Sequence, residues 1–132
     1  MPHHELHKKR ILIIDDDDCV RHAIKRILIM EGYENIEQLE NPMEAKQMIS
    51  DFQPHLVILD IKMPEKDGYE ICLDIRTHPD SSKIKIIGMS GISGGIGDAI
   101  LNSLGANAFF TKPFDHTCFL EKIQMLLTEN AS

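Results

Sequence analysis

The sequence predicts an α/β protein built on a doubly wound parallel sheet, and three observations carry that prediction. Short apolar runs alternate five times with longer segments whose apolar residues recur every three or four positions. The central runs, residues 11–14, 56–59 and 84–89, are almost continuously apolar, as in parallel strands covered on both faces. The length of 132 residues fits one domain. Right-handed crossovers then give a (βα)5 fold, with the flavodoxin-like strand order 2-1-3-4-5.

The first elements follow from apolar spacing and a glycine. A strand is expected at 10–15. A helix at 17–31 is expected to place Val20, Ile24, Ile27 and Leu28 on one face. Gly32 ends that helix. The next strand, 35–39, is short and more polar, which is typical of a sheet edge.

Prolines mark several of the later boundaries. Asn41 and Pro42 form a helix start, and the helix to residue 52 has an apolar stripe of Met43, Ala45, Met48 and Ile49. Pro54 precedes a strand at 55–60, and Pro79 follows a helix at 68–77. The remaining expected elements are a strand at 84–89, a helix at 94–104, a strand at 106–111 and a helix at 115–128. Four glycines within 91–97 predict a weak start to the helix at 94–104.

The chain is expected to divide into a flexible leader, residues 1–9, and a single domain, residues 10–129. The leader is polar and aperiodic, so its histidines, His3, His4 and His7, are interpreted as solvated rather than metal-binding.

Composition narrows the class of function. A formal net charge of −7 argues against direct binding of nucleic acid, which needs a basic surface. The three cysteines, Cys19, Cys72 and Cys118, are far apart and odd in number, so they are interpreted as reduced thiols. No apolar run is long enough for a membrane span or a signal peptide. A cytoplasmic protein without membrane contact is expected.

Polar side chains follow the expected strands at their carboxyl ends. Asp15 and Asp16 end the first strand, Asp60 the third, Ser90 the fourth, and Lys112 the fifth. These ends converge on one edge of a parallel sheet, where ligands of open α/β sheets bind. A carboxylate such as Asp60 can act as a nucleophile toward phosphorus, and nearby carboxylates can hold Mg²⁺.

Each of these residues also has an ordinary structural interpretation, as a turn, cap or surface residue. Asp17 and Asp18 are expected only to start the following helix, through N-capping and first-turn charge. The joint occurrence of the other five at strand ends is what favours a site.

Four motifs together resemble the receiver domain of two-component response regulators, including chemotaxis-regulator-like members. They are Ile-Leu-Ile-Ile-Asp-Asp-Asp, Leu-Val-Ile-Leu-Asp-Ile-Lys-Met-Pro-Glu-Lys-Asp-Gly, Ile-Ile-Gly-Met-Ser-Gly and Gly-Ala-Asn-Ala-Phe-Phe-Thr-Lys-Pro-Phe. The resemblance covers about residues 9–128. It implies a phosphorelay protein that accepts a phosphoryl group from a sensor histidine kinase or a histidine phosphotransfer protein.

The resemblance also implies a role for each site residue. Asp60 is the phosphoacceptor. The divalent cation, Mg²⁺ or Mn²⁺, is bound by Asp16 directly, by Asp15 mainly through water, by Asp60 and by the backbone carbonyl of Lys62.

Other positions match the parts of the family that respond to the phosphoryl group. Ser90 and Lys112 contact it, and Ser90 and Phe109 form the conformational switch. Gly68 allows the tight turn into the third helix. Phosphoryl acceptance and slow self-dephosphorylation do not make such a protein an enzyme. Its output is expected through a downstream effector protein or an effector domain outside this chain.

Three alternatives remain open from the sequence. An aspartyl-nucleophile phosphatase or phosphotransferase places a second acid two residues after its nucleophile, where this chain has Lys62. A flavin-binding protein is disfavoured by the acidic strand ends and the absence of tryptophan. A receiver-like interaction module that needs no phosphorylation is the third.

Overall fold

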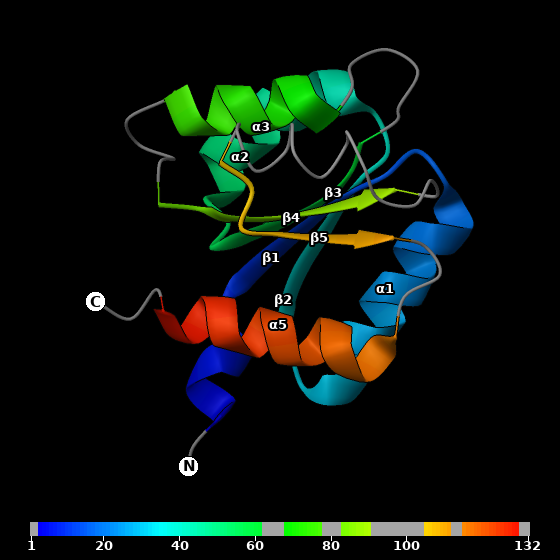
Figure 1. Ribbon diagram of the computed structural model, residues 1–132, viewed down its shortest axis with the longest axis vertical. Helices are drawn as coiled ribbons and strands as arrows, with labels where there is room; N and C mark the ends of the chain where they lie inside the picture. Colours follow the sequence, from blue (N-terminus) through cyan, green and yellow to red (C-terminus); the bar gives the residue numbers. More distant parts are fainter. Residues whose placement is uncertain (1–2, 62–67, 78–82, 91–104, 112–114, 130–132) are drawn as a thin grey trace.

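A computed structural model describes residues 3–61, 68–77, 83–90, 105–111 and 115–129. Its centre is a five-stranded parallel sheet in the order β2-β1-β3-β4-β5, which confirms the predicted fold class and strand order. Figure 1 shows α1 and α5 against one face of this sheet and α2 and α3 against the other.

The elements lie close to their predicted bounds. The strands are β1 (Arg10–Ile14), β2 (Asn35–Leu39), β3 (Leu56–Asp60), β4 (Lys85–Ser90) and β5 (Ala108–Thr111). The α-helices are α1 (Asp18–Glu31), α2 (Ala45–Phe52), α3 (Gly68–Thr77) and α5 (His116–Glu129), and the 3-10 helices are η1 (His3–Lys8) and η2 (Pro42–Glu44). The predicted helix at 94–104 and the glycine-rich stretch 91–97 lie outside the described residues. Within the described ranges, no helix is long and apolar enough to cross a membrane.

Two apolar clusters, one on each face of the sheet, form the core. Successive residues of β1 and β3 alternate between them, because a strand points its side chains to opposite faces. On the α1 and α5 face, Ile24, Leu28, Phe119 and Ile123 pack against the sheet. On the other face, Ala45, Ile71 and Ile75 do so. The apolar strands are buried on both sides, so their carboxyl ends are held on a rigid base.

The predicted caps of α1 are present. The Asp17 side chain accepts hydrogen bonds from the backbone N–H groups of Cys19 and Val20, and Asp18 lies in the first turn. Gly32 ends the helix with a φ of 111°, which is in the left-handed region that favours glycine. Asp17 and Asp18 therefore serve the helix start, as the sequence indicated.

The helix after Asn41 differs from the prediction in two respects. Asn41 caps a 3-10 turn, η2, and regular α-helix begins only at Ala45. Met43, predicted to lie on the buried stripe, is 60% exposed because it belongs to η2 and lies off the face that α2 packs against the sheet.

The N-terminal segment was predicted to be a flexible leader, yet residues 3–8 form η1. Leu6 packs against the core, and the His7 ring contacts the edge of Tyr33 with centroids 5.5 Å apart. The Glu34 N–H donates to the His7 carbonyl at 2.9 Å, and the Asn35 side chain donates to the Lys8 carbonyl at 2.8 Å. Contacts with residues distant in the sequence order this segment, so its local sequence gave no sign of them.

Candidate functional site

The strand register brings Asp15, Asp60 and Ser90 to one edge of the sheet. Ile14 of β1 pairs with Leu59 of β3, so Asp15 and Asp60 follow at the same level. Asp60 in turn pairs with Met89 of β4, which places Ser90 one residue further along. The carboxyl ends of β1, β3 and β4 therefore converge as expected for this fold.

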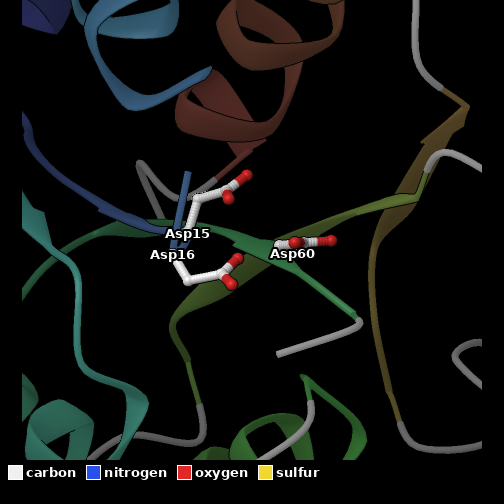
Figure 2. A group of neighbouring side chains, drawn as sticks. All are labelled: Asp15, Asp16 and Asp60. Carbon is white, nitrogen blue, oxygen red and sulfur yellow. The ribbon is translucent and has the colours of Figure 1, made fainter. Parts of the chain in front are cut away.

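Three carboxylates form an acidic cluster at this edge: Asp15, Asp16 and Asp60. One ligand oxygen from each lies within 4.8 Å of the others. Figure 2 shows Asp15 and Asp16 leaving the end of β1 and reaching toward the side on which Asp60 lies. Asp15 is fully buried and Asp60 is 7% exposed, whereas Asp16 is open to solvent.

The chemistry of this cluster fits a hard divalent cation. Like charges held this close repel one another, and burial increases the cost, unless a cation neutralises them. Mg²⁺ prefers carboxylate oxygens, keeps several water ligands and is bound through one or two carboxylates. Two buried carboxylates and one exposed carboxylate provide such oxygens with a side open to water.

Asp15 is held in place by main-chain hydrogen bonds on both sides. Its N–H donates to the Leu39 carbonyl at 3.2 Å, which ties it to β2. Its Oδ1 accepts the Asp17 N–H at 2.9 Å. Its carbonyl accepts Nη1 of Arg21 at 2.5 Å. The position of the Asp15 carboxylate is therefore set by β2 and by the first turn of α1.

Arg21 is the residue at this site that the sequence analysis missed. Its side chain is 8% exposed, and it also forms an ion pair with Asp18 one turn earlier in α1. A signal was present: Arg21 falls on the same helical stripe as Ile24 and Leu28, where a charged residue is out of place without a partner.

The backbone at Asp60 and Ile61 lies against the start of α3. The Ile61 N–H donates to the Met89 carbonyl at 3.0 Å, and the Gly68 N–H donates to the Ile61 carbonyl at 2.7 Å. A Cβ on Gly68 would lie 2.6 Å from the Asp60 carbonyl oxygen and 2.8 Å from the Ile61 Cα. The φ of Gly68 is not in the left-handed region, so close approach, rather than a special turn, explains why glycine suits this position.

Ser90 and Phe109 lie on one face of the sheet. Gly88 pairs with Phe109 and Ser90 with Thr111, and residues two apart on a strand share a face. Ser90 is buried and Phe109 is partly buried. The two predicted switch residues are therefore on neighbouring strands and project to the same side. Lys62 and Lys112 lie outside the described residues.

Comparisons with a family model and with individual relatives point to one protein family. The model of the response regulator receiver domain family matches residues 11–124. Chemotaxis protein CheY of Listeria monocytogenes is 35% identical over 87% of this chain and 95% of its own length. The probable transcriptional regulator ycf27 of Cyanophora paradoxa is 36% identical over 96% of this chain and 52% of its own length. The chain thus spans nearly all of the chemotaxis protein but only about half of the transcriptional regulator.

Solved structures agree with the sequence comparisons. The signal receiver domain of a DNA-binding response regulator from Colwellia psychrerythraea superposes with a TM-score of 0.86 at 30% identity, covering 92% of this chain and 99% of that one. A CheY-like receiver domain protein from Methanospirillum hungatei gives a TM-score of 0.85 at 31% identity, covering 93% and 96%. The protein described here belongs to the response regulator receiver domain family of two-component systems.

Proposed function

We propose that Asp60 accepts a phosphoryl group from a phosphohistidine, with Mg²⁺ or Mn²⁺ held by Asp15, Asp16, Asp60 and the backbone carbonyl of Lys62. Phosphoryl acceptance is the function expected of the family. The observation that supports this assignment is the acidic cluster, in which three carboxylates from the ends of β1 and β3 present oxygens within 4.8 Å of one another.

Asp60 is the member of the cluster best suited to be the nucleophile. It ends the central strand β3, whose residues are all buried, and only 7% of it is exposed. A carboxylate oxygen of Asp60 attacks phosphorus, a P–O bond forms, and the P–N bond to the donor imidazole breaks with its electron pair left on nitrogen. The bound cation supplies positive charge that offsets the repulsion between carboxylate and phosphoryl oxygens.

The neighbouring strands carry the response to phosphorylation. We assign Ser90 and Lys112 to hydrogen bonding and charge pairing with the phosphoryl oxygens. When Ser90 turns toward the phosphoryl group, Phe109 on the next strand moves into the space on the shared face. Added charge at Asp60 thereby changes packing along β4 and β5.

The assignment of Asp60 as phosphoacceptor also implies partners and a cellular location for this protein. Receiver domains interact with histidine kinases and effectors. For this chain we propose a sensor histidine kinase or histidine phosphotransfer protein as donor and an effector protein or effector domain as recipient. We propose that the protein acts as a phosphorylation switch and not as an enzyme. We place it in the cytoplasm, where three free cysteines remain reduced.

The experiment that tests the proposal is intact-mass measurement after incubation with acetyl phosphate and Mg²⁺. The wild type is expected to gain one acid-labile phosphoryl group, and Asp60→Ala is expected to gain none. No adduct on the wild type, or an equal adduct on Asp60→Ala, contradicts the proposal.

A further inference from the structure

Arg21 is a nearly buried cation whose side chain hydrogen-bonds to the backbone of the acidic cluster. Its Nη1 donates to the Asp15 carbonyl at 2.5 Å, and its Nη2 pairs with the Asp18 carboxylate. Neither bond uses a carboxylate oxygen of the acidic cluster. The guanidinium therefore binds the backbone and the helix start that carry the cluster, through bonds to the Asp15 carbonyl and the Asp18 carboxylate.

The position of Arg21 in α1 explains why its side chain reaches the Asp15 carbonyl. Helical side chains lean toward the N-terminus of their helix, so Arg21 covers the turn that precedes it. Its own N–H donates to the Asp17 carbonyl at 3.1 Å, which keeps it in the first turn of α1. The planar guanidinium donates to two acceptors at once, a geometry that a lysine ammonium does not reproduce.

We infer that Arg21 is a positioning residue of the metal site: it fixes the turn from β1 to α1 so that Asp15 and Asp16 present their carboxylates to the cation. This inference rests on the proposed function of the acidic cluster. Mg²⁺ demands near-ideal octahedral geometry, so its affinity depends on how firmly its carboxylates are placed. Residues that orient metal ligands through hydrogen bonds typically contribute tenfold or more in affinity.

Arg21 also contributes a permanent positive charge beside the acidic cluster. Before the cation binds, its positive charge offsets part of the repulsion among the three carboxylates. Substitution by a neutral residue would change both charge and geometry. Arg21→Lys keeps the charge and removes the two-pronged hydrogen bonding, so it isolates the positioning effect.

The test is a Mg²⁺ titration of the unphosphorylated protein, followed by amide chemical shifts. Arg21→Lys is expected to raise the Kd for Mg²⁺ about tenfold. Arg26→Lys, the same exchange on the exposed side of α1, is the matched control, and Ile24→Val controls for loss of stability within the same helix. Both are expected to bind Mg²⁺ within about twofold of the wild type.

The outcomes separate this inference from the proposed function. A wild type with no saturable Mg²⁺ binding refutes both. A wild type that binds Mg²⁺, together with an Arg21→Lys variant of equal affinity, overturns the inference alone, even if the variant is less stable.

A second measurement needs no variant. In the wild type, the Arg21 guanidinium is expected to give resolved side-chain NMR signals that shift with the same Kd as the amides. Averaged signals that do not respond to Mg²⁺ contradict a positioning role.

Discussion

The close approach of Gly68 to the backbone of Asp60 and Ile61 leads to a quantitative prediction. In Gly68→Ala the new Cβ would lie 2.6 Å from the Asp60 carbonyl oxygen, 0.8 Å less than the 3.4 Å at which ordinary contact begins. Its nearest backbone neighbours belong to Asp60 and Ile61, so relief of the overlap requires the main chain at Asp60, the proposed phosphoacceptor, or at the start of α3 to move.

The displacement needed to relieve this overlap sets the expected loss of stability and the expected loss of phosphorylation rate. Overpacking of this kind costs about 2 kcal/mol of the free energy of unfolding. For a domain of this size that is roughly an 8 °C fall in Tm. A shift of the nucleophile approaching 1 Å costs about tenfold to a hundredfold in the rate of phosphoryl transfer. Gly68→Ala is therefore expected to lose stability and phosphorylation rate together.

The assay compares thermal unfolding with the initial rate of phosphorylation by acetyl phosphate at a temperature where all variants are folded. Gly32→Ala is the control, since a Cβ there meets the His7 ring and φ is 111°, but the residue ends α1 away from the acidic cluster. It is expected to lower Tm without changing the rate. A Gly68→Ala protein with the wild-type rate would contradict a coupling between this glycine and the position of Asp60.

Two further predictions concern the other end of the sheet. Burial, with a smaller contribution from Glu31, raises the pKa of Tyr33 to about 12 from the 10.0 of a free phenol. The unfolded chain thus loses this proton first, and the stabilisation by Tyr33, full below pH 10, is lost as pH rises through the folded pKa. Denaturant titrations at pH 9 to pH 11 should show a shallower loss of stability in Tyr33→Phe, and equal slopes would contradict the buried phenol. Deletion of residues 1–8 removes Leu6 from the core and should lower the free energy of unfolding by about 1–3 kcal/mol, whereas an unchanged Tm would show that η1 contributes nothing.

Most of the fold was predictable because its signals are local. The continuously apolar runs at 11–14 and 56–59 are long enough to identify buried strands, and each β-strand lies within two residues of its expected bounds. The convergence of Asp15, Asp16 and Asp60 followed from parallel topology alone, since residues at the carboxyl ends of adjacent strands meet.

What the sequence did not reveal depends on tertiary contacts or on departures from regular helical spacing. The order of η1 comes from Leu6 and His7 packing near Tyr33, and no local pattern in a polar segment indicates it. Arg21 falls on the buried stripe of α1, but this spacing alone does not identify its partner, the Asp15 carbonyl. Met43 was misplaced because a 3-10 turn changes the helical spacing that the apolar stripe assumed.

Chemical identification of the phosphorylated residue tests directly whether Asp60 is the phosphoacceptor. Borohydride reduces an aspartyl phosphate to homoserine, so phosphorylated protein can be reduced, digested and sequenced by mass spectrometry. We expect homoserine at position 60 and unmodified aspartate at positions 15 and 16. Homoserine at position 15 or 16, with Asp60 intact, would contradict this assignment.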